Sequence, residues 1–516
     1  MNKKGFSLIE IIVVIALLGA IMILVVPNLT KNYKDSKKRL FYDNVVSLYT
    51  SAGRSFLLLD NPSSKTFSND GNVLLDAEVS DDITYKIIVN SYGEVISIYV
   101  TDGIYTYFKS KKDEIKKGDI KLDDIVEGTD KLDIPNEDDT SSDGETLLSR
   151  ILNDNPTISE RSNFSTPFTT TNTGTLYKAT ESIAGSTAKD VYYFAGDAKN
   201  NWVKFGKHQT SLIKYRGYYT SDPSNYREYS TMEECTSATA YNTNCTEFKF
   251  YSASDDIYWR IIRTNSDGSI RLLYSGTSPD TTKGYLGISL FNTLCTNPKY
   301  VGYMYGDNDI TLGEARTNTN DSTIKTYIDN WYEKNFTAYT NYLSNDAVYC
   351  NDRVLASGST YTTTSSSIFY FKPYERLYTN KTPTYDCTNN KDAFSVNNTE
   401  AKLKYPIALM TADEIAYAGG VAFTTLISPY VWYYLNSTGD SITGIDLWLL
   451  LSPGSWSDGC RNLWLVTGSV YPGRLYNNRI PSLGVRPAIS LKSCVLYKSG
   501  NGSADNPYEI IENGGC

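Results

Sequence analysis

The sequence predicts an α+β protein in which a long N-terminal helix and a small antiparallel sheet precede a much larger α+β domain. Three observations support this class. A nearly unbroken apolar run covers residues 6–26, short β-like runs separated by turn residues follow it, and all eight cysteines and seven tryptophans lie at or beyond residue 202. At 516 residues the chain is too long for one hydrophobic core, so we expect separate domains joined by a linker.

The N-terminal helix is predicted over residues 6–60, with a membrane span over residues 6–26. At about 1.5 Å of rise per residue this run covers roughly 30 Å, the thickness of a hydrocarbon core. Glu10 interrupts the run. Because an unpaired carboxylate in lipid is costly, Glu10 is expected to have a function. Beyond residue 26 the helix continues with one apolar stripe, which includes Phe41 and Val45.

Residues 3–10, Lys-Lys-Gly-Phe-Ser-Leu-Ile-Glu, resemble the processing site of type IV prepilins and pseudopilins. The resemblance implies that prepilin peptidase removes a leader of residues 1–5, cutting after Gly5, and methylates the new amino group of Phe6. It also implies that Glu10 pairs with the Phe6 amine of a neighbouring subunit. Prepilin peptidase and other pilin subunits are therefore the expected partners. A plain signal peptide or membrane anchor is the alternative, but it leaves Glu10 without a role.

The same resemblance implies a location. The unprocessed chain is expected to be a single-pass membrane protein, and the processed chain to be part of a filament at the cell surface. An even number of cysteines in an exported segment favours disulfides. The expected pairs, among many arrangements that remain open, are Cys235–Cys245, Cys350–Cys387 and Cys494–Cys516, which leaves Cys295 with Cys460.

A small pilin-like β-domain is predicted over residues 61–110, with strands at residues 73–75, 83–89, 94–100 and 104–108. Residues 111–165 are predicted to be an acidic flexible linker. Between residues 111 and 146 acidic residues outnumber basic ones more than twofold and aromatic residues are absent. Such a composition does not support a packed core.

Residues 166–516 are predicted to form one large exported domain. Asn-Ser-Asp-Gly at residues 265–268 separates two β-like runs, residues 258–263 and 270–274, which predicts a hairpin. One helix is expected over residues 322–343. A second is expected to begin at Thr411, where Thr-Ala-Asp-Glu forms a capping box.

Five segments of this domain recur in the same order in surface proteins of Firmicutes and mollicute-like bacteria. They are residues 201–205, 258–263, 350–353, the helix beginning at Thr411, and residues 484–489. The last, Gly-Val-Arg-Pro-Ala-Ile, is similar to the end of C-type-lectin-like domains of the sulfatase-modifying type. The resemblance implies a C-type-lectin-like fold, which hosts binding modules and a few oxidases.

The expected ligand surface is the glycine-rich stretch of residues 453–478. Aromatic faces and planar polar groups together suit sugar binding, so a glycan or a host or matrix protein is the expected ligand. The candidate residues are Trp456, Asp458, Arg461, Asn462, Tyr471, Arg474 and Asn477. In the alternative interpretation, Trp464 and Trp448 alternate into the core and the Asn and Gly residues only form turns.

Composition and motifs argue against several other functions. A net charge of −9 does not suit nucleic-acid binding. The chain has one histidine, His208, expected at the surface, and no C-x-x-C pair, so neither a metal nor a cofactor is expected. Cys460 is expected in a disulfide rather than as a thiol activated by Arg461. No P-loop, nucleophile elbow or dinucleotide fingerprint occurs, so we expect no catalytic residues and no enzyme.

These patterns together predict a minor or tip pilin that assembles through its N-terminal helix and presents a binding domain for adhesion. Two alternatives stay open. One is a pseudopilin of a type II secretion or DNA-uptake system. The other is a filament-displayed enzyme of the sulfatase-modifying fold.

Overall fold

The computed structural model describes residues 8–56, 65–69, 75, 77, 79–80, 82–90, 93–110, 114–128, 145–220, 222–364, 366–444, 446–457, 459–478 and 482–512. In the first part of the N-terminal helix, up to residue 32, it describes only the side chains of Ile12, Val13 and Leu17. The chain forms two compact units, residues 1–143 and residues 144–516. Each unit has its own hydrophobic core.

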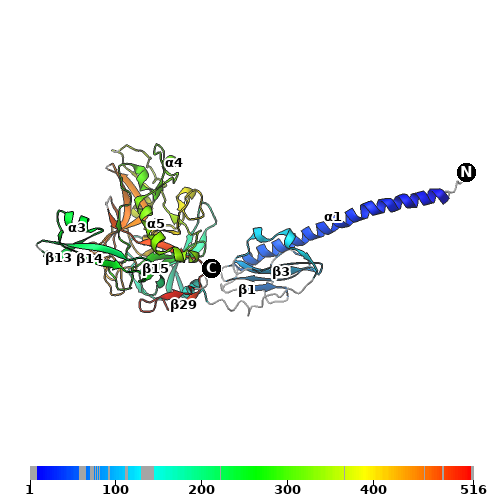
Figure 1. The fold of residues 1–516 in the computed structure, drawn as a ribbon, viewed down its shortest axis with the longest axis horizontal. Helices are drawn as coiled ribbons and strands as arrows, with labels where there is room; N and C mark the ends of the chain where they lie inside the picture. Colours follow the sequence, from blue (N-terminus) through cyan, green and yellow to red (C-terminus); the bar gives the residue numbers. More distant parts are fainter. Residues whose placement is uncertain are drawn as a thin grey trace. The chain divides into compact units, whose positions relative to one another are not determined.

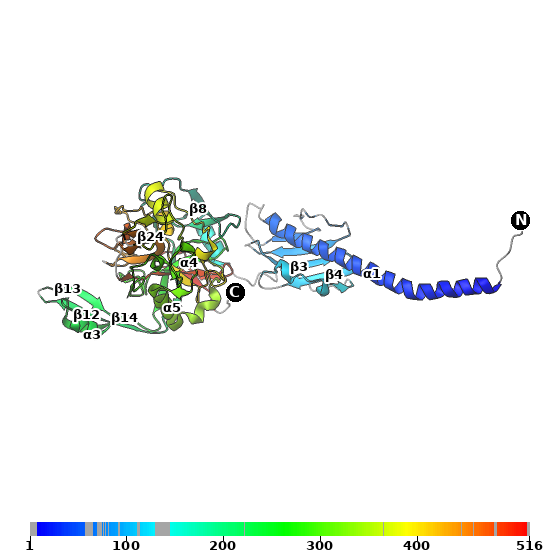
Figure 2. The same cartoon turned by 90° about the horizontal axis from the view of Figure 1, so that it is seen from above.

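The first unit is a long helix, α1 (Leu8–Phe56), packed on a five-stranded antiparallel sheet (Figures 1 and 2). The strands follow one another in chain order: β1 (Lys65–Ser68), β2 (Thr84–Val89), β3 (Val95–Thr101), β4 (Tyr105–Ser110) and β5 (Val126–Glu127). Three predicted strands agree with β2, β3 and β4. The fourth, at residues 73–75, falls mostly outside the described residues.

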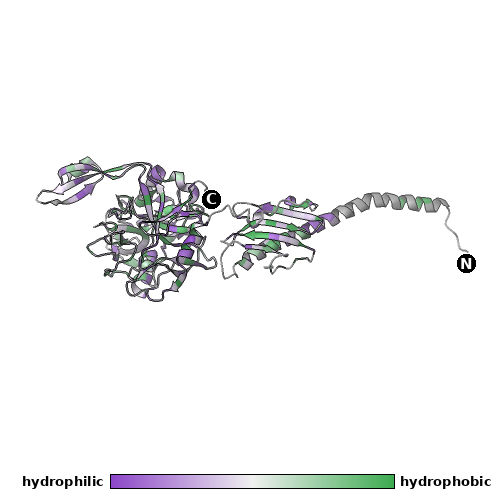
Figure 3. Cartoon of the chain, turned by 90° about the horizontal axis from the view of Figure 1, so that it is seen from below, coloured by the Kyte–Doolittle hydropathy of each residue, from purple (hydrophilic) through white to green (hydrophobic). Residues whose placement is uncertain are grey.

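The second half of α1 and the sheet form the core of the first unit. Helix residues spaced three or four apart are buried, as one apolar stripe requires: Phe41, Val45, Leu48, Ala52 and Phe56. They pack with strand residues such as Ile87 and Ile98, which pair across β2 and β3. Figure 3 shows apolar residues on this part of the helix and on the strands that it covers. The predicted amphipathic stripe is therefore confirmed.

Both ends of the predicted linker are folded, which differs from the expectation of a flexible segment. Residues 114–128 form two 3₁₀ turns, η1 (Lys117–Asp119) and η2 (Leu122–Asp124), and strand β5 of the first sheet. Ile115, Ile120 and Ile125 are 0–3% exposed in the core of this unit. Three buried isoleucines stabilise an otherwise charged stretch, because each buried aliphatic side chain contributes about 2 kcal/mol.

At its other end, the predicted linker contributes to the second unit. Helix α2 (Leu147–Asp154) begins there, capped by the Thr146 hydroxyl, which accepts from the backbone N–H of Ser149. Leu147 and Ile151 are buried in the core of the second unit. Residues 114–128 and 145–154 are therefore folded despite the acidic composition, whereas residues 129–144 lie outside the described residues.

The second unit is built around a ten-stranded sheet. Its strands are β6 (Thr157–Glu160), β8 (Thr175–Glu181), β9 (Lys189–Tyr193), β11 (Trp202–Lys207), β15 (Asp256–Thr264), β16 (Ile270–Tyr274), β23 (Ile407–Leu409), β28 (Pro487–Leu491), β29 (Tyr497–Ser499) and β30 (Tyr508–Ile510). The predicted hairpin at residues 258–274 is confirmed, because β15 and β16 pair antiparallel around its turn.

A second sheet of six strands completes the core. It contains β17 (Ile288–Ser289), β21 (Phe369–Tyr370), β24 (Trp448–Ser457), β25 (Cys460–Val466), β26 (Leu475–Asn478) and β27 (Leu483–Gly484). Three pairs of short strands lie outside both sheets: β7 (Thr171–Asn172) with β10 (Asp197–Ala198), β18 (Met304–Tyr305) with β19 (Asn320–Asp321), and β20 (Tyr349–Cys350) with β22 (Ala393–Phe394).

A separate three-stranded sheet projects from the rest of the second unit (Figures 1 and 2). It consists of β12 (Leu212–Tyr219), β13 (Asp222–Tyr229) and β14 (Thr243–Tyr251), with the short helix α3 (Met232–Ser237) between β13 and β14. The disulfide Cys235–Cys245 joins α3 to β14. This cross-link stabilises a projection that is too small to have a large core of its own.

The remaining helices are short. They are α4 (Leu312–Ala315), α5 (Thr323–Asn335), α6 (Lys372–Tyr374) and α7 (Ala412–Ala418), the 3₁₀ turns η4 (Pro298–Val301), η5 (Thr337–Tyr342) and η7 (Asn390–Asp392), and the π-helical turn η6 (Glu375–Asn380). The helix predicted over residues 322–343 is α5 followed by η5. The predicted capping box at Thr411 is confirmed, and α7 ends at Gly419, whose φ of +126° suits glycine.

Two arginines in the segments singled out in the sequence lie in the interior of the second unit. Arg260 is buried, stacks 4.2 Å from the ring of Trp202 and donates from Nε to Oδ1 of Asn201 at 2.6 Å. Arg486 is fully buried and donates to the backbone oxygen of Tyr433 at 2.9 Å. Burial lowers the pKa of both guanidinium groups to about 9. These arginines hold neighbouring segments of the unit together, which is a structural role.

Three predicted disulfides are confirmed: Cys235–Cys245, Cys350–Cys387 and Cys295–Cys460. Cys460 is therefore not a free thiol. Cys494 is also disulfide-bonded, whereas Cys516 lies outside the described residues.

Candidate functional site

The first half of α1 extends beyond the sheet of the first unit (Figure 1). Ile12, Val13 and Leu17 are 51–58% exposed there, and exposed apolar side chains gathered on one segment favour contact with a partner or with lipid. Glu10 lies on this helix, but its side chain is outside the described residues, as are Gly5 and Phe6.

The membrane span predicted over residues 6–26 falls mostly on side chains outside the described set. Within the described part of the chain, no helix is both long enough and apolar enough to cross a membrane.

Three of the predicted ligand residues are buried in the second sheet. Trp456 is fully buried, and Arg461 and Asn462 are 5% and 8% exposed. The Arg461 guanidinium donates to the backbone oxygens of Asn292 and Leu294, both at 2.9 Å, and burial lowers its pKa to about 10. These side chains hold β24 and β25 to neighbouring segments. Trp464 and Trp448 are 0% and 1% exposed, as the alternative interpretation expected, but Asn462 lies in strand β25 rather than in a turn.

Three other predicted ligand residues lie nearer to solvent. Tyr471 is 51% exposed. Arg474 and Asn477 are half-buried, and the Arg474 guanidinium stacks 4.6 Å from the ring of Tyr476 and 5.5 Å from that of Tyr471. Asp458 lies outside the described residues.

A continuous group of aromatic rings extends away from Arg474, whose guanidinium contacts Tyr476 and Phe423 at one end of it. Neighbouring ring centroids are 4.5–5.3 Å apart from Tyr370 through Tyr374 and Tyr378 to Phe423, and then to Tyr476. Tyr370 and Tyr378 are 37% and 47% exposed, and the other three are half-buried. We refer to these rings, together with Tyr471 and the cation beside them, as the aromatic surface. Its residues are Tyr370, Tyr374, Tyr378, Phe423, Tyr471, Tyr476 and Arg474.

The backbone beneath the aromatic surface has two uncommon features. Residues 375–380 form the π-helical turn η6, a form found frequently at functional sites. Phe423 and Lys381 have φ values of +62° and +54°, which non-glycine residues adopt at an energetic cost. The N–H of Phe423 donates to the backbone oxygen of Leu475 at 2.8 Å, which holds the ring against β26. Such strain is concentrated at binding and active sites.

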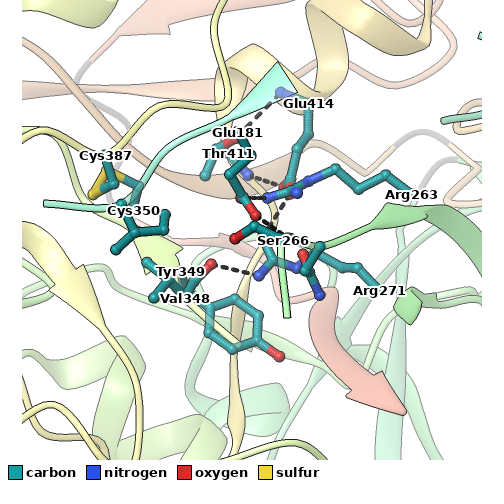
Figure 4. Close-up of polar contacts among 12 residues, drawn as sticks. Glu181, Arg263, Ser266, Arg271, Val348, Tyr349, Cys350, Cys387, Thr411 and Glu414 are labelled. Carbon is teal, nitrogen blue, oxygen red and sulfur yellow. Dashed lines mark hydrogen bonds and ion pairs between the residues drawn. A yellow bond between two sulfur atoms is a disulfide. The ribbon is translucent and has the colours of Figure 1, made fainter. Parts of the chain in front are cut away.

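A second polar feature of this unit is a buried ion network (Figure 4). Arg263 bonds to Glu181 at 2.8 Å and to Glu414 at 3.0 Å, and Arg271 bonds to Glu414 at 2.7 Å. All four side chains are at most 3% exposed. Burial alone would raise the pKa of both carboxyl groups, but the charges of the two arginines outweigh it and hold both pKa values below their ordinary range. The network is charge-balanced and joins β8, β15, β16 and α7.

A pocket of about 470 Å³ lies beside this network, lined in part by Glu181, Asp267, Asp346 and Lys189. The carboxylates on its rim have partners. Asp267 accepts from the hydroxyl of Ser344 at 2.6 Å, for example. Among the described side chains, no group of His, Cys, Asp and Glu is arranged to hold a metal ion. We therefore assign the ion network a structural role.

His208 was expected at the surface, but it is only 1% exposed. Its neighbours Lys207 and Gln209 are exposed, so the two-residue alternation of an extended backbone turns the ring between them inward. The ring stacks 3.8 Å from that of Tyr251, and Nε2 is 3.1 Å from the hydroxyl of Tyr274. Burial lowers the pKa of His208 to about 4.

This burial predicts a loss of stability in mild acid. An unfolded histidine binds a proton near pH 6.5 whereas folded His208 does not, so the contribution of His208 is complete above pH 6.5 and is lost as the pH falls towards 4. The loss should reach about 3 kcal/mol. Urea unfolding at pH 7.5 and 4 would measure it, with His208→Gln as reference. If the difference in free energy of unfolding between the two proteins stayed constant with pH, the lowered pKa of folded His208 would be refuted.

Comparisons with known proteins identify only the N-terminal segment. Residues 1–26 match the family model described as the prokaryotic N-terminal methylation motif. No curated protein and no solved structure matches the chain, so the predicted resemblance to C-type-lectin-like domains has no support from these comparisons. The methylation motif implies a type IV pilin-like or pseudopilin-like protein that is processed by prepilin peptidase and assembles with pilin subunits at the cell surface.

Proposed function

We propose that this chain is a minor or tip pilin that presents a ligand-binding unit on a type IV pilus-like filament. The observation that carries the proposal is the combination of one assembly helix with a second unit that spans residues 144–516. Subunits that assemble through a common helix pack closely, so a second unit of this size on every subunit would collide with its neighbours. A low copy number or a position at the tip avoids that collision.

Assembly in this proposal uses the first half of α1. The exposed side chains of Ile12, Val13 and Leu17 would be buried between neighbouring helices, with a gain of about 25 cal/mol for each Å² of apolar surface removed from water. Glu10 would pair with the methylated amine of Phe6 on the next subunit. That pairing neutralises two charges that an apolar filament core could not otherwise accommodate.

Ligand binding in this proposal uses the aromatic surface. Tyrosine offers a large and rigid contact area with a polar tip, and it is favoured at recognition surfaces for that reason. Tyr370, Tyr378 and Tyr471 are 37–51% exposed. A surface of this kind supports adhesion to a glycan or to a host or matrix protein.

Mass spectrometry of purified surface filaments tests the proposal. The mature chain should begin at methylated Phe6 and be present in far fewer copies than the main filament subunit. A Gly5→Ile variant, which places a large side chain at the cleavage site, should retain Met1 and be absent from filaments. A chain as abundant as the main subunit would contradict a minor or tip role. Absence from surface filaments, together with a secretion or DNA-uptake defect on deletion, would favour the pseudopilin alternative.

A further inference from the structure

Two cations beside the rings of the aromatic surface have no anionic partner among the described residues. Arg474 stacks 4.6 Å from the ring of Tyr476, and Lys381 lies 5.4 Å from the ring of Tyr378. Neither side chain forms an ion pair or a hydrogen bond with any group in the described part of the chain. A cation held over a ring without a counter-ion is available to an anionic ligand.

Arg474 differs in this respect from other arginines of the second unit that are removed from solvent. Arg461 donates to two backbone oxygens, and Arg263 donates to two carboxylates. The half-buried Arg474 has no such acceptor, and its Nε is buried without a partner. The terminal nitrogens of its guanidinium are not among the buried unpartnered atoms and therefore reach solvent. Because unpaired donors are costly, an acceptor from outside the chain would stabilise this arrangement.

The amide of Asn477 does not add a donor to this surface. Asn477 follows Tyr476 on β26, and neighbouring residues of a strand point to opposite faces of the sheet. Its Nδ2 is buried without a partner, while its Oδ1 is 3.3 Å from the Ser455 hydroxyl. The aromatic surface thus combines partly exposed rings with a cation whose terminal nitrogens reach solvent.

We propose that the aromatic surface binds acidic carbohydrate that contains hexuronate residues. The carboxylate of the sugar pairs with the guanidinium of Arg474, and the apolar C–H faces of the sugar rings lie against the tyrosine and phenylalanine rings. Lys381, beside Tyr378, favours a second negative charge further along the chain of sugars. This inference rests on the proposed adhesive role and names its ligand class.

The charges distinguish this ligand from the alternatives. A neutral sugar would use the rings but leave Arg474 unpaired. An apolar partner would bury both cations without an anion, which costs several kcal/mol. An acidic peptide would satisfy Arg474 but would lack flat C–H faces for Tyr370, Tyr374 and Tyr378. A carboxylated sugar satisfies both parts of the surface.

The experiment is a calorimetric titration of the full-length protein in detergent micelles. The probes are an oligogalacturonate, a neutral oligosaccharide of the same length, and oligoglutamate. The oligogalacturonate should bind, and the other two should bind at least about 10-fold more weakly. The neutral oligosaccharide lacks the bidentate charge-assisted pair with Arg474, and oligoglutamate lacks the sugar C–H faces that lie against the rings. Binding should weaken as salt is raised, because the pair is near the surface.

Variants locate the site. Arg474→Gln should weaken oligogalacturonate binding at least about 10-fold, and Tyr378→Ala should weaken it by a similar factor. Arg227→Gln is the matched control, because Arg227 is exposed, stacks 5.1 Å from the ring of Tyr241 and lies on the projecting sheet instead. Equal melting temperatures would show that the variants are folded. Absence of oligogalacturonate binding, equal binding of all three probes, or unchanged binding by Arg474→Gln would each overturn the proposal.

A filament measurement separates this inference from the proposed function. Arg474→Gln should enter filaments as well as the original protein does, because Arg474 is far in sequence from the assembly helix and belongs to the other compact unit. Incorporation without oligogalacturonate binding would refute the ligand class and leave the pilin role in place. Binding in micelles by a chain that is absent from filaments would refute the pilin role alone.

Discussion

Glu414→Gln is expected to destabilise the second unit by about 3–5 kcal/mol, since the change leaves two buried arginines with one carboxylate. Glu414 is 1% exposed and accepts from Arg263 at 3.0 Å and from Arg271 at 2.7 Å. Glutamine keeps the side-chain shape, and its amide oxygen can still accept from the N–H of Thr411 in the capping box. The substitution therefore removes a charge and turns the amide N–H₂ group toward the guanidinium groups of Arg263 and Arg271, with little loss of packing or capping.

Glu509→Gln is the matched control for this prediction. Glu509 also contacts two cations, Lys204 and Lys498, but its side chain is 23% exposed and those of the lysines are 31% and 59% exposed. Surface ion pairs contribute about 1 kcal/mol or less, so this change should shift the free energy of unfolding by no more than that. Urea unfolding of both variants at pH 7 would measure the difference. If both variants lost the same free energy of unfolding, the buried network would stabilise the protein no more than a surface ion pair does.

The buried ion network should stabilise the folded protein less as the pH falls. The pKa values of Glu181 and Glu414 are held below their ordinary range in the folded protein. Their stabilising contribution is thus complete above the pKa of an unfolded glutamate, near 4.3, and is lost as the pH falls through the lower folded values. The stability gap between the original protein and Glu414→Gln should therefore narrow below about pH 4.

Local signals in the sequence predicted the elements that depend on nearby residues. The capping box at Thr411 and the Asn-Ser-Asp-Gly turn at residues 265–268 are each determined within a few residues, and both are confirmed. The buried stripe of α1 follows from helical spacing alone. Three disulfide pairs were also predicted correctly, but Cys295 and Cys460 are 165 residues apart and were paired only because the other cysteines had been assigned.

Orientation of side chains toward core or solvent was harder to predict, because it depends on which strands become neighbours. Trp456, Arg461 and Asn462 have the composition of a binding loop, yet they are buried because β24 and β25 lie inside the unit. His208 has polar neighbours in sequence but packs against Tyr251, which is more than forty residues away. Such long-range pairings leave no local signal.

Only some residues of the aromatic surface were predicted from the sequence. Tyr471 and Arg474 were among the predicted ligand residues, but Tyr370, Tyr374 and Tyr378 were not. Their four-residue spacing is the signal that could have identified them, because residues four apart share a face of a helical turn. Phe423 could not have been found this way, since a separate loop brings it to the surface.

Glu10→Ala is expected to reduce incorporation into filaments more than about 100-fold, because an unpaired charge in an apolar contact costs about 3 kcal/mol or more. In the proposed filament, removal of the carboxylate leaves the methylated amine of Phe6 without a partner. Cleavage after Gly5 should be unaffected, since the processing site itself is intact. Mass spectrometry of membranes and of sheared filaments would report processing and incorporation separately.

Two further variants test whether charge is the cause. Glu10→Gln preserves shape and polarity but not charge, so it should fail to incorporate as Glu10→Ala does. Asp43→Ala removes an exposed carboxylate from the second half of the same helix, and it should incorporate normally. Normal assembly of Glu10→Gln would show that a hydrogen bond is sufficient at this position. Normal assembly of Glu10→Ala would refute the pairing with Phe6. Filaments of this variant, in which the Phe6 amine has no carboxylate partner, would then be as stable as filaments of the original protein.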